Sequence, residues 1–91
     1  MRIRSAYFLA FCLEREEETG PRIGLTVPRA LGKAVVRNRI KRRMREAVRH
    51  QLSMLGPQWD VVLNPRKSVL EAPMPDLERE VDRVFERCKA S

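Results

Sequence analysis

Hydrophobic residues recur with two spacings along this chain, and the spacing separates predicted strands from predicted helices. Residues 5–13 are apolar on both alternating faces, which is typical of a strand covered on both sides, or covered on one side and lining a groove on the other. Residues 22–28 place alternate hydrophobic side chains on one face, and residues 59–63 repeat that pattern over a shorter length. The acidic, turn-rich loop between the first two segments predicts that they form a hairpin.

Two longer segments have the spacing of helices. Residues 33–55 place their apolar side chains within about a third of a helical circumference, and these side chains are Val36, Ile40, Met44, Ala47 and Val48. Gly32 supplies the turn before this helix, and Gly56 with Pro57 ends it. A second helix is predicted over residues 75–89, with Pro75 at its first position.

The order of these segments predicts one domain over residues 1–91. Its fold class is α/β in the broad sense, an α+β sandwich-like arrangement with a small sheet of three or four strands. The helix over 33–55 crosses between the second and third predicted strands, and the helix over 75–89 ends the chain. A chain of 91 residues is sufficient for one modest hydrophobic core and no more.

Charge is concentrated in the first helix. Residues 33–50 hold eight Lys or Arg and one acidic residue, a net charge of +7, which equals the net charge of the whole chain. Basic side chains on a helix often form a solvated face whose charge is balanced by acidic residues one turn away. Here Glu46 is the only acidic residue in the segment that could balance eight cations. Arg outnumbers Lys six to two in the segment, which favours bidentate contacts with phosphates. Nucleic acid is therefore the predicted partner.

Other classes of protein lack support in the sequence. The acidic residues over 14–18 lie close together on a turn and do not form a convergent metal or acid–base site. Cys12 and Cys88 lack the paired spacing of a zinc site and are interpreted as reduced packing residues. No apolar run is long enough for a bilayer span and no secretory signal pattern is present, so a cytoplasmic location without membrane contact is expected.

The basic helix also carries a motif. The run from Gly32 to Glu46 contains Arg37-Asn38-Arg39, followed by Lys41-Arg42 and Arg45-Glu46 at fixed offsets, and Ile23 to Val27 precede it. This pattern resembles the signature of the protein subunit of bacterial ribonuclease P. The resemblance covers residues 6–90, weakly outside the central motif. It implies an RNA-binding subunit that assists a catalytic RNA in removing the 5′ leader from precursor tRNA. It also implies that the RNA partner holds the Mg²⁺ and carries out the chemistry.

The resemblance assigns roles to residues of this chain. It implies no catalytic residue and no protein-bound metal or cofactor. Together with the charge pattern, it marks as RNA-binding residues Lys33, Arg37, Asn38, Arg39, Lys41, Arg42, Arg45 and Arg49. The candidate groove for the leader consists of Tyr7, Phe8, Phe11, Arg37 and Lys41. Plain core packing is the alternative for these aromatic side chains, and Gly32 is the structural turn before the motif.

Two expectations about the fold also come from the resemblance. The family uses a left-handed crossover around its basic helix, whereas parallel crossovers are right-handed in nearly all proteins. The family also has a helix before its first strand, while here a strand begins almost at Met1. We therefore expect part of the leader groove to be missing, and a start codon upstream of Met1 is one explanation.

Two other functions remain open at the level of sequence. A structural RNA-binding protein of another ribonucleoprotein, such as a ribosomal protein, would share the basic helix. A DNA-binding helix would present a few short polar side chains to base edges rather than a continuous arginine face, and no dimer seam is visible.

Overall fold

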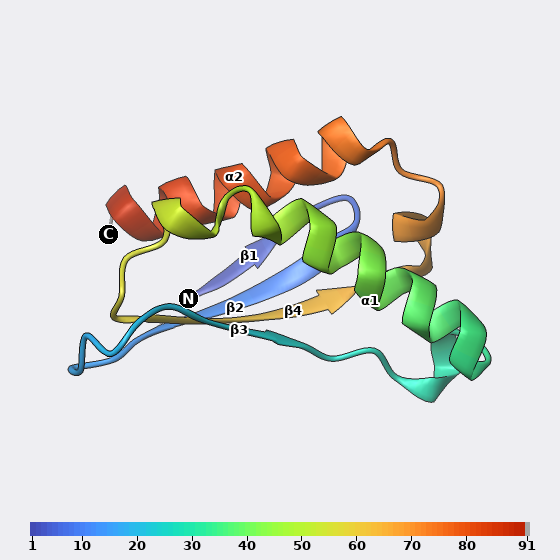
Figure 1. The fold of residues 1–91 in the computed structure, drawn as a ribbon, viewed down its shortest axis with the longest axis horizontal. Coiled ribbons are helices and arrows are strands. Elements are labelled where there is room, and N and C mark those ends of the chain that lie inside the picture. The colour runs from blue at the N-terminus through green and yellow to red at the C-terminus, as the bar shows by residue number, and fades with distance from the viewer. Residues whose placement is uncertain (91) are drawn as a thin grey trace.

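The protein, described over residues 1–90 by a computed structural model, is a four-stranded sheet with both long helices on one face (Figure 1). The strands lie in the order β1-β2-β4-β3. Their bounds are Arg2–Arg4 for β1, Phe8–Glu14 for β2, Arg22–Leu25 for β3 and Trp59–Pro65 for β4. The helices are α1, Ala34–Arg49, and α2, Met74–Ala90. The predicted mixed fold with a basic crossover helix is confirmed.

The strand predicted over residues 5–13 is in fact the second half of a tight hairpin. Residues 5–7 form the turn, in which the Ser5 amide donates to the Phe8 carbonyl at 2.9 Å. β1 then pairs antiparallel with β2, with Arg2 opposite Phe11 and Arg4 opposite Leu9. The three residues of β1 are too few to show a period in the sequence, so this strand was not predicted.

The hairpin predicted between residues 5–13 and 22–28 is wrong, because β4 lies between those two segments. β2 pairs antiparallel with β4 along its whole length, from Phe8 opposite Pro65 to Glu14 opposite Trp59. β3 pairs in parallel with β4 and ends at Leu25. The ladder between β2 and β4 has seven residue pairs, against four in β3, so a direct β2–β3 pair would form fewer contacts.

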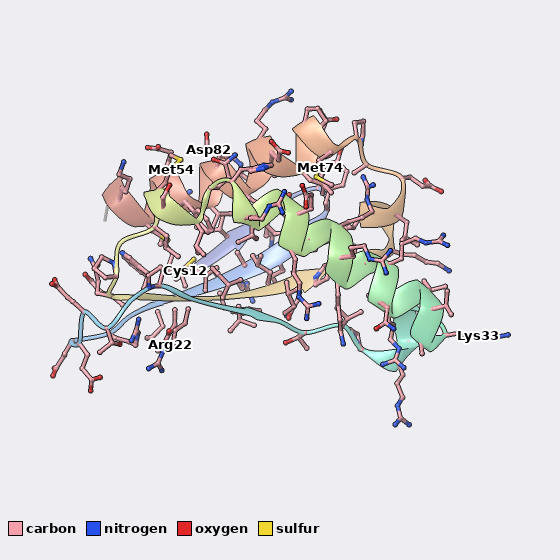
Figure 2. All side chains as sticks on the ribbon, viewed as in Figure 1. Cys12, Arg22, Lys33, Met54, Met74 and Asp82 are labelled. Atoms are coloured by element: carbon pink, nitrogen blue, oxygen red, sulfur yellow. The ribbon has the colours of Figure 1, made fainter. Side chains whose placement is uncertain are left out.

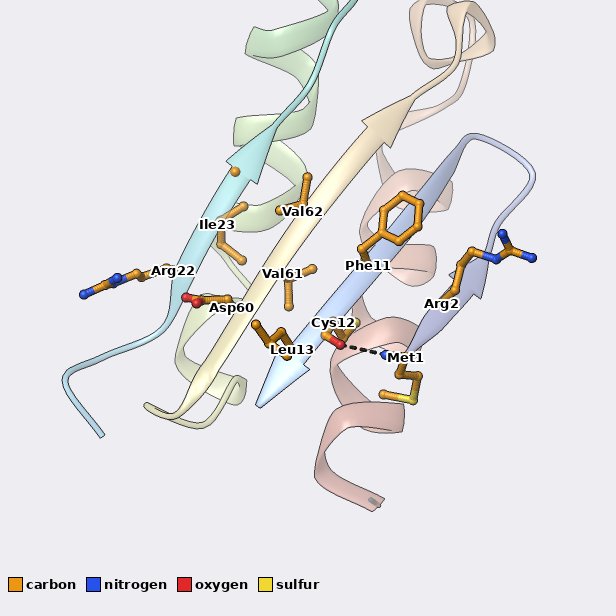
Figure 3. A pocket seen from close by; sticks show the side chains of 11 residues that line it. Met1, Arg2, Phe11, Cys12, Leu13, Arg22, Ile23, Asp60, Val61 and Val62 are labelled. Carbon is orange, nitrogen blue, oxygen red and sulfur yellow. Dashed lines mark hydrogen bonds between the residues drawn. The ribbon is translucent and has the colours of Figure 1, made fainter. Parts of the chain in front are cut away.

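The crossover from β3 through α1 to β4 is left-handed. Figure 3 views the sheet from the face without helices, with the arrows of β3 and β4 both pointing up. β4 lies to the right of β3 and α1 lies behind the sheet, and the same arrangement seen from the helix side places β4 to the left. This is the hand that the family resemblance implied and the opposite of the general rule.

α1 is shorter than the predicted helix over 33–55. It ends at Arg49, and Leu52–Met54 form a separate 3₁₀ turn. Leu55 is buried and already extended, with φ −85° and ψ 129°, because the chain must turn there to enter β4. Gly32, before α1, has φ +138°, a conformation that favours glycine, and an added Cβ would meet Val36 at 3.1 Å.

One core fills the space between the sheet and the two helices. Phe8, Ala10 and Leu63 lie fully buried on the helix-facing side of the sheet. α1 and α2 cover them with a second buried set: Ile40, Met44, Ala47, Val48, Leu77, Val81, Val84, Phe85 and Cys88. Within the described residues, neither helix has the length and apolar character to cross a membrane.

α2 is also tied to the turn between β1 and β2. Arg83 donates a hydrogen bond to the Arg4 carbonyl at 2.6 Å and contacts the Glu80 carboxylate at 3.3 Å. The hydrogen bond from Arg83 lowers the pKa of Glu80, and a second one from Ser5 acts in the same direction. The C-terminal helix therefore closes the hairpin end of the sheet as well as covering the core.

Candidate nucleic-acid interface

The outward face of α1 carries the largest group of exposed cations. Periodicity places the apolar side chains of this helix against the sheet, and the opposite side chains therefore reach solvent. Six of the eight residues predicted to bind RNA are exposed: Lys33, Asn38, Arg39, Arg42, Arg45 and Arg49. Arg37 and Lys41 are half-buried at the border of the apolar face, as predicted. Lys33 stands at the start of the helix and projects away from the molecule (Figure 2).

Very little negative charge opposes these cations. Glu46 is the only acidic residue of α1, and its carboxylate lies 2.9 Å from Nη2 of Arg49 in an exposed ion pair. Within residues 1–90, Arg39, Arg42 and Arg45 have neither an ion pair nor a hydrogen bond from their side chains. Like charges one turn apart destabilise an isolated helix, and a polyanion removes that cost.

The exposed side chains form two shallow hollows rather than a flat surface. Asn38, Arg42, Arg45, Glu46 and Arg49 line a hollow of about 400 Å³. Arg39 and Val35 join Asn38 and Arg42 around a second one of about 210 Å³. Asn38 and Arg42 line both, so the two hollows are neighbours on the helix. Guanidinium groups on the sides of a furrow can hold successive phosphates of one strand.

Arg43 differs from its neighbours in what it contacts. Its Nε donates to the Val69 carbonyl at 2.8 Å and its Nη2 donates to the Ala72 carbonyl. Both acceptors lie at or just after the 3₁₀ turn Lys67–Leu70, which leads into α2. Arg43 is therefore a structural residue that fixes this connection to α1. The sequence gives no signal for this role, because the acceptors are backbone atoms distant along the chain.

The face of the sheet without helices forms a second candidate surface. Phe11, Leu13 and Val62 are 40%, 65% and 38% exposed and point outward from β2 and β4 (Figure 3). They line a groove of about 510 Å³. Arg2 from β1 and Arg22 from β3 stand at its two opposite edges (Figure 3). An apolar floor between two arginines is suited to a single strand, with bases on the floor and phosphates at the rim.

The five residues predicted to form the leader groove do not lie together in the structure. Phe8 is fully buried on the helix-facing side, so its assignment to the groove is wrong. Phe11 lies on the helix-free face, whereas Arg37 and Lys41 belong to α1 on the other side of the sheet. Tyr7 is half-buried against the core. Side chains alternate along β2, so Leu9, Phe11 and Leu13 share the face opposite Phe8. Of the two interpretations of this strand, the structure agrees with the one in which helices cover one face and the other face lines a groove.

Cys12 and Cys88 are free, buried thiols, in accord with their interpretation as packing residues. Burial raises the pKa of Cys88 to about 12 and also raises the pKa of Cys12. Groups of three or more His, Cys, Asp or Glu side chains placed to hold a metal ion do not occur among residues 1–90. The candidate interface therefore consists mainly of basic and apolar side chains, with Glu46 in the hollow on α1 and Asp60 in the groove on the sheet as its acidic residues.

A family model places this arrangement among known proteins. The model described as ribonuclease P matches residues 1–89. The chain belongs to the ribonuclease P protein family. Among curated ribonuclease P protein components, the one from Symbiobacterium thermophilum is 43% identical over 75 residues, which are 82% of this chain and 65% of that protein. The one from Brucella melitensis biotype 1 is 42% identical over 89 residues, covering 88% of this chain and 63% of that protein.

The fold of the family is also that of the chain. The ribonuclease P protein from Thermotoga maritima superimposes with a TM-score of 0.80 at 25% identity, covering 96% of this chain and 82% of that one. The chain spans slightly less than two thirds of the two curated relatives described above. In this chain, the Arg37-Asn38-Arg39 motif lies near the start of the crossover helix.

Proposed function

We propose that the chain is the RNA-binding protein subunit of a ribonuclease P, which assists a catalytic RNA in removing the 5′ leader from precursor tRNA. The observation that carries the proposal is the outward face of α1, where exposed arginines outnumber a single acidic residue. Membership of the ribonuclease P protein family supports it. The proposed partners are the catalytic RNA and precursor tRNA, and the proposed location is the cytoplasm.

In this proposal α1 binds the catalytic RNA through its phosphates. The residues assigned to this contact are those predicted from the motif: Lys33, Arg37, Asn38, Arg39, Lys41, Arg42, Arg45 and Arg49. Each neutralised phosphate releases condensed counterions, so affinity is expected to depend steeply on salt. The first turn of α1 has no side-chain cap, which leaves its backbone N–H groups available for another phosphate.

The helix-free face is the proposed site for the 5′ leader. Phe11 provides the aromatic surface on which a base can stack, and Leu13 with Val62 extends the apolar floor. Arg2 and Arg22 at opposite edges can hold the backbone of a strand that crosses the sheet. Stacking is tolerant of sequence, which suits leaders of different sequence. Tyr7, Arg37 and Lys41 lie outside this floor and are not part of the site proposed here.

In this proposal the RNA partner, with its Mg²⁺, cleaves the precursor tRNA, and the protein binds the RNA partner and the leader. A structural protein of another ribonucleoprotein shares the need for a basic helix, but the comparisons do not favour it. No specific observation supports DNA as the ligand.

Reconstitution tests this function directly. Protein purified free of RNA is added to the catalytic RNA of the same organism, and precursor tRNA cleavage is measured at low Mg²⁺ concentration. We expect the protein to raise the rate of leader removal and to have no activity alone. The variant with Arg42→Glu and Arg45→Glu should lose this effect, whereas the charge-matched control with Arg79→Glu and Lys89→Glu on α2 should retain it. Equal rates with and without the protein would contradict the proposal.

A further inference from the structure

An apolar pocket lies between the edge strand and the basic helix, next to the interface described so far. Its wall on β3 is formed by Ile23 and Leu25, and the 3₁₀ turn after α1 adds Leu52. Val48, Arg45 and Arg49 complete it from α1, and the pocket holds about 380 Å³.

The pocket exists because β3 is the last strand of the sheet. No further strand covers the outer side of β3, so Ile23, Leu25 and Leu52 pack against the core and yet remain only partly buried. No acidic residue lines the pocket. Between its four aliphatic side chains a polar group would find few partners, whereas a flat, weakly polar group would be desolvated favourably.

Arg45 and Arg49 connect this pocket to the basic face. They line the apolar pocket and also the hollow that contains Asn38 and Arg42. The two arginines are therefore a shared wall, with aliphatic side chains on one side and cationic groups on the other. The side chain of Arg45 has no ion-pair partner within residues 1–90, so its guanidinium is available to either side.

A nucleotide has the same two-part chemistry, with an anionic phosphate joined to a flat base. We infer that the pocket receives one unstacked nucleobase of the RNA whose phosphates lie along α1, with Arg45 and Arg49 bound to the adjoining phosphate or stacked on the base. Guanidinium planes and apolar side chains both accept splayed-out bases in RNA recognition. This inference rests on the proposed RNA-binding function and adds a base contact to it.

Titration of the unaltered protein with small probes tests the pocket without any mutation. Adenosine 5′-monophosphate and ribose 5-phosphate carry the same phosphate, but only the first has a base. In NMR spectra of methyl-labelled protein, we expect the base-bearing probe alone to shift the methyl resonances of Ile23, Leu25, Val48 and Leu52 in a saturable way. Identical methyl shifts with both probes, or none with either, would overturn the inference.

A matched pair of variants tests the same contact with RNA. Leu52 and Leu70 are both half-buried leucines in 3₁₀ turns, but only Leu52 lines this pocket. We expect Leu52→Gln to weaken binding of the catalytic RNA by about fivefold to a hundredfold and Leu70→Gln to change it less than twofold, both at unchanged salt dependence. Equal affinities of the two variants for the RNA would contradict the nucleobase pocket but not the proposed RNA-binding function. If the variant with Arg42→Glu and Arg45→Glu also binds normally, the proposed function fails with it.

Discussion

Nε of Arg15 lies 3.1 Å from Oδ1 of Asp60, and this ion pair joins the loop after β2 to the start of β4. The same guanidinium donates to Oγ1 of Thr19 at 2.7 Å and to the carbonyls of Pro57 and Gly20. Only 12% of the Arg15 side chain is exposed. One arginine therefore organises the loop of residues 15–21, whose other charged residues are acidic and exposed.

Removal of this arginine should cost stability. Arg15→Ala leaves the Asp60 carboxylate without its ion-pair partner and removes the hydrogen bonds to the carbonyls of Gly20 and Pro57. We therefore expect the free energy of unfolding to fall by about 2 to 3 kcal/mol. Urea denaturation followed by circular dichroism measures it. Glu17→Ala in the same loop is the control and should change stability by less than about 0.5 kcal/mol. Equal values for the two variants would show that the Arg15 contacts contribute nothing.

Substitution of two adjacent arginines of α1 should affect different properties, RNA binding for Arg42 and stability for Arg43. Arg42→Ala removes an exposed cation, so the slope of log affinity for RNA against log salt should become shallower by about one, with little change in stability. Arg43→Ala removes the two carbonyl contacts to residues 69 and 72, so it should lower the free energy of unfolding by about 2 kcal/mol. Filter binding over a range of salt concentrations and urea denaturation separate the two effects. If the slope of log affinity against log salt became shallower in Arg43→Ala and not in Arg42→Ala, Arg43 rather than Arg42 would be the RNA contact.

Two phenylalanines of β2 provide a similar contrast across the sheet. Phe8→Ala opens a cavity in the core and should cost about 3 to 5 kcal/mol of stability. Phe11→Ala removes a 40% exposed ring and should change stability little, while affinity for a single-stranded leader falls by about 1 to 3 kcal/mol. The measurement compares binding of precursor and mature tRNA by the reconstituted complex. If Phe11→Ala leaves their ratio unchanged, the helix-free face is not the leader site.

The buried thiols should make stability sensitive to alkaline pH. Cys88 has a pKa raised to about 12 by burial, from an ordinary value of 9.0, so the folded state keeps its proton where the unfolded state loses it. This contribution is complete below about pH 9 and is lost as pH rises towards 12, by up to about 1.4 kcal/mol per pH unit. Unfolding free energies at pH 8 and pH 10.5 should therefore differ less in Cys88→Ala than in the parent protein. Identical differences would mean that the thiol ionises equally in both states.

The sequence predicted the basic face of α1 well because a helical period fixes which side chains share a face. The apolar positions from Val36 to Val48 determined the core side, and the exposed arginines followed. The assignment of Phe8 to a groove was wrong for the opposite reason. A strand that is apolar on both faces does not reveal which face the helices cover, and the covered face became clear only from the packing of α1 and α2.

Long-range pairings were the other source of error. Local patterns favoured a hairpin between neighbouring segments, whereas β4 inserts between β2 and β3 and pairs with both. The carbonyls that bind Arg15 and Arg43 also come from distant parts of the chain. Hydrogen bonds to backbone atoms carry no residue-type signal, so the structural roles of these two arginines could not be predicted from the sequence.

The central position of β4 has a consequence for biosynthesis. β4 is the last strand to leave the ribosome, and β3 has no other partner in the sheet. A nascent chain that stops before Trp59 can form the β1–β2 hairpin, but it cannot close the sheet beneath α1. The arginine-rich segment is therefore synthesised before the surface that holds it exists, and closure of the sheet must await the synthesis of β4. Newly made protein should consequently remain sensitive to proteases until β4 has left the ribosome, and an RNA bound early to the arginine-rich segment would encounter it as a flexible polycation.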